Sequence, residues 1–163
     1  MKNVMAVPKL TKEVINMPPW FFRFSGNVVK WLLPVTIAVL FVGAFWGLLV
    51  APPDYRQGNS YRIIYIHVPA AVVSLAGYYV MALAGAISLI WRIKMADIAM
   101  KAAAPVGAVL TGIALVTGAI WGKPTWGTWW VWDARITSML ILFFLYLGVV
   151  ALFEAYENKA AAA

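Results

Sequence analysis

Four long stretches of this sequence contain no charged residue, and they constrain the fold more than any other feature. Each stretch is about 18–24 residues long, which as an α-helix is enough to cross the roughly 30 Å hydrocarbon core of a bilayer. The composition agrees, because 64% of the residues are hydrophobic and only 12% are charged, whereas a soluble domain carries about 25% charged residues. We therefore predict an all-α integral membrane helical bundle that forms a single transmembrane domain over residues 1–163. Its four transmembrane helices are expected at about residues 31–50, 66–91, 102–120 and 135–153.

The positive charges predict the orientation of these helices. Nine of the thirteen lysines and arginines lie on the side that holds both termini and the connection at residues 92–101, and four lie on the other side. The positive-inside rule therefore places both termini in the cytoplasm and segments 51–65 and 121–134 on the outer face. Residues 1–30 are expected to be cytoplasmic or interfacial, with Met17–Phe24 lying on the membrane surface. The net charge of +7 is explained in large part by this topology, helped by anionic lipid at the membrane surface. A nucleic-acid partner is not needed to explain it.

The first outer segment leads to the only histidine of the chain. Pro52–Pro53 ends the first helix, Gly58–Asn59 makes a turn, and Ser60 is a plausible N-cap for a helix that carries His67 near the outer interface. One interpretation of His67 is an interfacial side chain that is hydrogen-bonded to a neighbour. The other is a functional group, because ionisable residues at membrane depth are rare and neutral imidazole is the usual axial ligand of heme iron. A zinc site is poorly supported, and the absence of cysteine excludes thiolate chemistry and covalent heme attachment.

The second outer segment, WGTWWVWDARIT, has four tryptophans within twelve residues. Trp126, Trp129 and Trp130 are spaced i, i+3 and i+4, which puts them on one side if the segment is helical. Trp121 and Trp132 extend this aromatic surface. Tryptophans in an interfacial belt are spread around a protein at both interfaces, whereas these five are concentrated on one side. The pattern favours a flat platform for a planar ligand, with the belt as the alternative.

Three charged residues accompany these aromatic rings. Asp133 immediately precedes the fourth helix and is expected to cap its free N–H groups. Arg135 opposes the dipole of that helix and needs another partner, for which Asp133, a lipid phosphate and a ligand carboxylate are the candidates. Arg62, five residues before His67, raises the same question. A metal-centred planar ligand with carboxylates, such as heme, fits this set of residues, although a quinone or a lipid remains an alternative.

Two motifs resemble a known family. WGKPTWGTWWVWDARIT closely resembles the tryptophan-rich "WWD" signature of the heme-handling membrane proteins that mature c-type cytochromes, and GNSYRIIYIHVPAA matches the first outer segment of the heme exporter protein C family (CcmC). The resemblance implies a multi-pass protein of the bacterial inner membrane, not an enzyme, that binds heme b non-covalently at its periplasmic face. It further implies delivery of heme to the membrane-anchored heme chaperone CcmE, beside the ABC transporter subunits CcmA and CcmB and the small single-helix subunit CcmD.

The resemblance also assigns roles to individual residues. His67 matches the family's first axial histidine, and Arg62 and Arg135 match arginines expected to steady the heme propionates. The residues that match the signature itself are Trp126, Trp129, Trp130, Trp132 and Asp133. The family pattern has six helices and a second axial histidine between helices 5 and 6, whereas this sequence stops after its fourth helix with ENKAAAA. We therefore expect a truncated chain; if it is whole, the heme is five-coordinate or takes its second ligand from a partner.

Two other functions stay open on the sequence alone. One is a structural subunit of a membrane ABC transporter complex, in which the aromatic rings serve as a docking surface without heme ligation. The other is a membrane oxidoreductase that uses heme or quinone. This second alternative is weaker, because one histidine and no cysteine provide few redox ligands.

Overall fold

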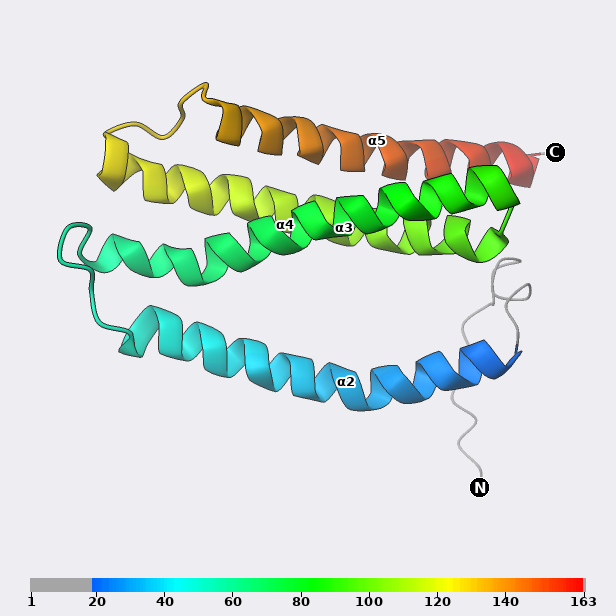
Figure 1. Ribbon diagram of the computed structural model, residues 1–163, viewed down its shortest axis with the longest axis horizontal. Coiled ribbons are helices and arrows are strands. Elements are labelled where there is room, and N and C mark those ends of the chain that lie inside the picture. The colour runs from blue at the N-terminus through cyan, green and yellow to red at the C-terminus, as the bar shows by residue number, and fades with distance from the viewer. Residues whose placement is uncertain (1–18, 163) are drawn as a thin grey trace. The chain divides into compact units, whose positions relative to one another are not determined.

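The structure, a computed structural model, describes residues 19–162, with side chains described as far as residue 156 (Figure 1). No β-strand is present within residues 19–162, and four of the helices there are long and apolar enough to cross a membrane. The predicted all-α fold with four membrane-length helices is therefore confirmed. In chain order the elements are α2 (Pro19–Phe45), the π-helical turn η1 (Trp46–Val50), the 3₁₀ helix η2 (Asn59–Ile63), α3 (Ile64–Trp91), α4 (Lys94–Trp126) and α5 (Ala134–Ala162). The chain divides into two compact units, Met1–Phe41 and Val42–Ala163.

The first unit contributes most of α2, a long apolar helix with no buried side chain. The helix begins at Pro19, and proline is favoured in a first turn because its missing N–H has no helical partner there. A separate surface segment was predicted at Met17–Phe24. Residues 17 and 18 lie outside the described part of the chain, and residues 19–24 form the first turns of α2, so their place at a membrane surface stays a prediction. The helix starts well before residue 31 because nothing between Pro19 and Lys30 stops a helix once it has begun.

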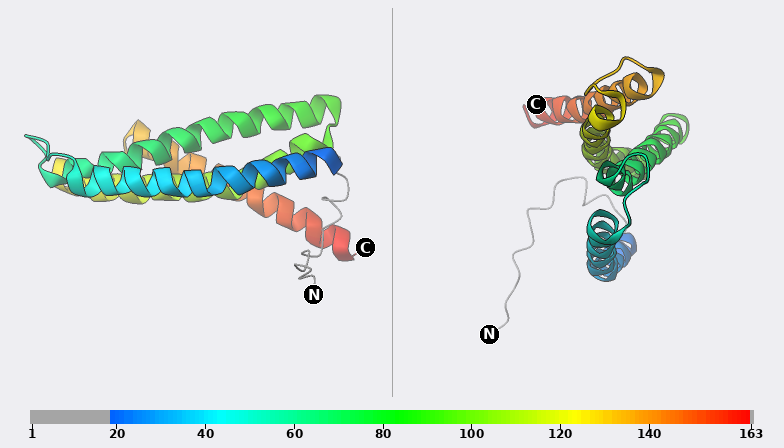
Figure 2. Two further views of the ribbon diagram at one scale, coloured as in Figure 1. Left: turned by 90° about the horizontal axis from the view of Figure 1, so that it is seen from below. Right: turned by 90° about the vertical axis from the view of Figure 1, so that its left-hand side faces the viewer.

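In the second unit, α4 packs against both α3 and α5 (Figures 1 and 2). The connection between α3 and α4 is only Arg92 and Ile93, where the sequence predicts a longer one at residues 92–101. The helix reaches back to Lys94 because Asp97 lies in its first turn, where a negative charge is favoured by the helix dipole. The Ser88 hydroxyl of α3 also donates a hydrogen bond to the Asp97 carboxylate, which ties the two helices together at this end.

A single tyrosine joins the three helices of this unit. Tyr146 of α5 is fully buried, and its hydroxyl donates a hydrogen bond of 2.7 Å to the carbonyl oxygen of Ser74 in α3. Its ring lies directly on Gly107 of α4, where an added Cβ would come within 2.1 Å of the ring atoms. Small residues at such contacts let membrane helices approach closely. The site residues lie near the start of α3 and the end of α4, so this contact holds together the helices that carry them.

Arg62 connects the end of η1 to the start of α3. Its Nε and Nη2 donate hydrogen bonds to the Ala51 carbonyl at 3.0 and 2.7 Å, and its Nη1 donates to the Leu48 carbonyl at 3.1 Å. The last carbonyls of a helix lack intrahelical partners, and a guanidinium supplies several donors in a fixed geometry. Arg62 therefore satisfies the backbone where η1 ends.

The turn before η2 differs from the prediction. Gly58 precedes the helix with φ 57°, and no side chain caps the helix start. The Ser60 hydroxyl instead donates its hydrogen bond to the Gln57 carbonyl. The N-cap role predicted for Ser60 is therefore wrong, because the chain enters a 3₁₀ helix one residue earlier, at Asn59. The loop itself is held by Asp54, whose Oδ1 accepts hydrogen bonds of 2.8 Å from the backbone N–H groups of Arg56 and Gln57.

Candidate functional site

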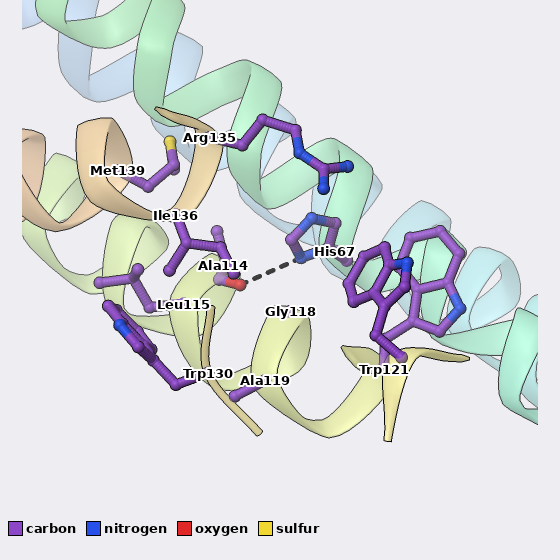
Figure 3. A pocket seen from close by; sticks show the side chains of 11 residues that line it. His67, Ala114, Leu115, Gly118, Ala119, Trp121, Trp130, Arg135, Ile136 and Met139 are labelled. Carbon is purple, nitrogen blue, oxygen red and sulfur yellow. Dashed lines mark hydrogen bonds between the residues drawn. The ribbon is translucent and has the colours of Figure 1, made fainter. Parts of the chain in front are cut away.

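A pocket of about 130 Å³ lies in the second unit, between α3, α4 and the start of α5 (Figure 3). Most of its wall is apolar, and its polar groups come from one imidazole, three indoles and one guanidinium. The lining residues are His67, Ala114, Leu115, Gly118, Ala119, Trp121, Trp126, Trp130, Arg135, Ile136 and Met139. The pocket therefore brings together side chains from His67 to Met139, which are separated by half of the described sequence.

His67 lies one turn into α3 and turns its ring toward α4 (Figure 3). Its Nδ1 is 3.0 Å from the Ala114 carbonyl oxygen and 3.1 Å from Thr117 Oγ1. The other ring nitrogen, Nε2, has no hydrogen-bond partner among the described residues. An added Cβ on Gly118 would lie 3.0 Å from the imidazole Cε1, so a side chain at this point of α4 would crowd the ring. One nitrogen of His67 is thus anchored, and the other is available to a ligand.

Trp121 links the histidine to the loop that precedes η2. Its ring meets the His67 ring edge to face, with the centroids 5.8 Å apart. Its Nε1 donates a hydrogen bond of 2.7 Å to Oε1 of Gln57. The sequence predicted Trp121 as part of an aromatic surface, but nothing in the sequence pairs it with Gln57.

The tryptophan-rich segment is not one helical face. α4 continues to Trp126 and ends at Gly127, which has φ 79° and donates its backbone N–H to the Lys123 carbonyl. Residues 127–133 form an irregular connection, so the predicted i, i+3, i+4 arrangement does not occur. Trp130 and Trp132 meet edge to face with their ring planes 74° apart, which is not the flat platform that the spacing suggested. The reason is Gly127, whose left-handed conformation ends the helix before Trp129 and Trp130 can join it.

Trp126 and Trp130 line the pocket, whereas Trp129 and Trp132 do not. Trp130 is largely buried, and its indole N–H has no hydrogen-bond partner in the described structure. Trp129 instead lies beside Lys123, whose Nζ is 6.0 Å from the ring centroid. The signature tryptophans therefore divide into two that contact the pocket and two that lie outside it.

Asp133 caps α5 as predicted, because its Oδ1 accepts a hydrogen bond of 2.9 Å from the backbone N–H of Ile136. This backbone bond, and the hydrogen bond from Arg135, lower the pKa of the Asp133 carboxyl below its ordinary value. Of the three partners considered for Arg135, the structure shows Asp133, with Nη2 and Oδ2 2.7 Å apart. The Arg135 guanidinium also lies 5.2 Å from the Trp126 ring centroid, and its side chain is 72% exposed. Arg135 is therefore paired, but it remains open to a ligand on its exposed side.

Among the predicted site residues, the pocket brings together His67, Trp126, Trp130 and Arg135. Arg62 does not line it, and its donors already serve the carbonyls at the end of η1. Asp133 contributes indirectly, through its ion pair with Arg135. The residues that sequence reasoning missed are Gln57, Ala114, Thr117 and Gly118. The only feature of the sequence that could have marked them is the pair Thr117–Gly118 within the apolar stretch at residues 102–120.

The residues that line the pocket fit a metal that is already bound to other ligands, as iron is bound to the porphyrin of heme. Within the described residues no group of three or more His, Cys, Asp or Glu side chains could hold a bare metal ion. A heme iron needs only one or two protein ligands, and His67 Nε2 supplies one. The pocket measures about 130 Å³, and the side chains in it that would hold a heme are His67, Trp126, Trp130 and Arg135.

Fold and site together define a class of protein: a multi-pass helical membrane protein with a lone histidine in a tryptophan-lined pocket at one end of its helices. A family model described as "Heme exporter protein C" matches residues 12–163. This chain therefore belongs to the heme exporter protein C family, as the sequence motifs suggested.

Curated relatives agree with this assignment. The chain is 54% identical to "Heme exporter protein C" of Escherichia coli (strain K12) over 149 residues, which cover 91% of this chain and 61% of the relative. It is 53% identical to the protein of the same name from Haemophilus influenzae over 87% of this chain and 58% of the relative. The protein of that name from Paracoccus denitrificans is 51% identical over 90% of this chain and 60% of the relative. The chain thus spans about three fifths of the length of these relatives.

Proposed function

We propose that this chain binds heme b non-covalently at the periplasmic face of the bacterial inner membrane and helps deliver it to a membrane-anchored heme chaperone during the biogenesis of c-type cytochromes. The observation that carries the proposal is the state of His67, whose Nδ1 is anchored to α4 while Nε2 has no hydrogen-bond partner among the described residues, in a pocket that Trp126 and Trp130 also line. The names of the relatives, which call them heme exporters, support the choice of ligand.

In this proposal each residue contributes one interaction. Heme, when bound, supplies an iron with an axial position that accepts a nitrogen ligand. His67 offers Nε2 to that position, and the rings of Trp126 and Trp130 contact the porphyrin. Arg135 has an exposed guanidinium next to the pocket and binds a propionate, because a guanidinium forms strong charge-assisted hydrogen bonds with a carboxylate.

The small size of the pocket suits a protein that passes heme on. A cavity that encloses a ligand buries most of its surface, typically within about 300–1,000 Å³. This pocket, at about 130 Å³, is smaller than that range, so a heme held there through His67 would leave part of its ring accessible. In the proposal this accessible part is where the chaperone CcmE receives the heme, beside the ABC transporter subunits CcmA and CcmB and the single-helix subunit CcmD.

The proposal is tested by titrating the protein in lipid nanodiscs with hemin and, in parallel, with iron-free protoporphyrin. If His67 ligates the iron, hemin binds more tightly and its Soret band shifts, whereas the iron-free ring shows only weak stacking on the indoles. Equal affinity for the two rings would exclude axial ligation. The alternative of a structural transporter subunit predicts neither a Soret shift nor saturable binding.

Replacing Arg135 with alanine is expected to weaken hemin binding by about 1–2 kcal/mol, roughly tenfold, since one charge-assisted hydrogen bond to a propionate is lost at an exposed position. Hemin titration of the variant measures this loss. Hemin dimethyl ester, which lacks the propionate charges, serves as the control and should bind both proteins equally. An unchanged affinity for hemin would contradict the role of Arg135.

Arg62 provides a comparison, because the same family resemblance proposes a propionate role for it. Its three hydrogen bonds to the Leu48 and Ala51 carbonyls lead us to expect that Arg62→Ala lowers the stability of the fold by about 1–3 kcal/mol. Thermal unfolding and hemin titration of the same sample separate the two effects. A normal melting temperature with weakened hemin binding would favour the propionate role for Arg62.

The orientation is also part of the proposal, and it is motivated by the asymmetry of the positive charges. The short turn at Arg92–Ile93 should be cytoplasmic, and the loop at residues 51–58 should be periplasmic. Insertion of a reporter enzyme that is active only in the periplasm should give no activity at Arg92 and full activity at Tyr55. The reverse pattern would place the pocket on the cytoplasmic side and remove the proposed delivery route.

A further inference from the structure

We propose that Thr117 is a positioning residue for His67: together with the Ala114 carbonyl it holds the imidazole in the tautomer with the proton on Nδ1, so that Nε2 presents its lone pair to the pocket. That Nε2 binds iron rests on the proposed function, whereas the tautomer itself does not.

The hydrogen bonds around Nδ1 assign its proton. The Ala114 carbonyl oxygen can only accept a hydrogen bond, and it lies 3.0 Å from Nδ1 of His67. Nδ1 must therefore be the donor, which leaves Nε2 without a proton in the neutral ring.

Thr117 supports this assignment because its hydroxyl proton is already donated to another oxygen atom. Thr117 Oγ1 donates to the Ile113 carbonyl at 2.7 Å, one turn earlier in α4. Its lone pairs then face Nδ1 of His67 at 3.1 Å, where they accept a second branch of the same N–H bond. A hydroxyl whose proton points away, and a carbonyl that has no proton, disfavour an unprotonated Nδ1 at this position.

This assignment matters because only the nitrogen without a proton can coordinate a metal. In water the neutral imidazole of histidine favours the proton on Nε2, the nitrogen that here faces the pocket. The two acceptors on α4 reverse that preference before any ligand arrives. Metal-ligating histidines in general donate their other N–H to a fixed acceptor, which sets the ring orientation and raises the basicity of the ligand.

The packing around the ring agrees with the orientation that the hydrogen bonds assign. Gly118 lies where a side chain would press on the imidazole Cε1 at 3.0 Å, so its lack of Cβ lets Nδ1 reach the α4 backbone. The ring also meets Trp121, which is itself held by its 2.7 Å hydrogen bond to Gln57. The His67 ring is thus held by the hydrogen bonds of Nδ1 and by its contact with the Trp121 ring. Thr117 is one of the groups that hold it.

The experiment uses the fact that His67 is the only histidine of the chain. Protein labelled with ¹⁵N-histidine gives one imidazole spin system, and its two nitrogen shifts report the tautomer directly, without heme, at a pH where the ring is neutral. We expect mainly the Nδ1–H form in the wild type, a clear rise of the Nε2–H form in Thr117→Val, and the wild-type spectrum in Thr117→Ser. Thr111→Val is the matched control, because Thr111 makes the same 2.7 Å bond to a carbonyl one turn earlier but does not contact His67.

A mainly Nε2–H wild type, or a Thr117→Val spectrum identical to that of the wild type, would overturn the proposal. A second measurement follows the effect on ligation: Thr117→Val should weaken ferric heme binding by about tenfold and raise the reduction potential, while Thr117→Ser restores both. Failure of the wild type to bind heme would count against the proposed function, and the NMR spectra would still decide the role of Thr117. Heme binding through His67 with unchanged affinity and potential in Thr117→Val would count against the positioning role alone.

Discussion

Replacement of His67 by glycine is expected to abolish heme retention. The chain has no second histidine or cysteine to take its place, so the iron loses its only strong protein ligand in this sequence. The loss of affinity should exceed the roughly 10–100-fold that follows from losing a supporting hydrogen bond of a metal ligand. The measurement is the Soret absorbance of hemin-loaded, purified protein, compared with the wild type at equal protein concentration.

Two controls make this result specific. Free imidazole fits the space left by the side chain and should restore the Soret band of His67→Gly. Glycine destabilises a helix by about 1 kcal/mol relative to alanine, so the glycine variant could lose heme because α3 is weakened. His67→Ala controls for this effect, and without imidazole it should lose heme as the glycine variant does. Normal heme binding in both variants without imidazole would show that His67 is not a required ligand.

Replacement of Gly107 by alanine should destabilise the second unit by about 2–6 kcal/mol. The new Cβ would lie 2.1 Å from Cε1 and Cζ of Tyr146, whose side chain is fully buried. Relief of this overlap requires α4 and α5 to separate, which costs about 1–3 kcal/mol for overpacking alone. It also weakens the buried hydrogen bond from Tyr146 to the Ser74 carbonyl, with a further penalty of about 1–3 kcal/mol.

The measurement is the midpoint of unfolding in mixed detergent micelles. Gly148→Ala is the matched control, since a Cβ at Gly148 meets nothing within 4 Å and the same chemical change should there be neutral or slightly stabilising. Equal unfolding midpoints for the Gly107→Ala and Gly148→Ala variants would contradict the central role of the Tyr146 contact.

The fold could be predicted from the sequence because the bilayer imposes a simple rule on it. A helix that crosses hydrocarbon must be apolar over its whole length, so the uncharged stretches marked four helices. The helix ends could not be predicted in the same way, because a helix continues into the aqueous phase when its residues allow it. α4 begins at Lys94 because Asp97 and Ser88 stabilise that end, and it continues to Trp126 because no residue before Gly127 ends it.

The candidate site could be predicted only where a rare residue marked it. A lone histidine, clustered tryptophans and a first-turn arginine stand out in an apolar sequence, and His67, Trp126, Trp130 and Arg135 do line one pocket. The partners of His67 do not stand out, because one is a backbone carbonyl and another is the missing side chain of Gly118.

Arg62 shows the limit of reading function from charge. Its position five residues before His67 suggested a ligand contact, yet its guanidinium binds the carbonyls at the end of η1. Which residue satisfies a helix end depends on how the chain turns after it, and the sequence around Pro52 and Pro53 does not specify that turn.

Electron–nuclear double resonance on the ferric, heme-loaded protein tests the central claim most directly. Protein labelled with ¹⁵N-histidine and loaded with unlabelled heme contains ¹⁵N in one side chain only, that of His67. The account predicts a strong ¹⁵N hyperfine coupling of a directly coordinated imidazole nitrogen, absent from protein with natural-abundance histidine. Bound heme with identical spectra in the two samples would show that the iron is not ligated by His67, and would contradict the account.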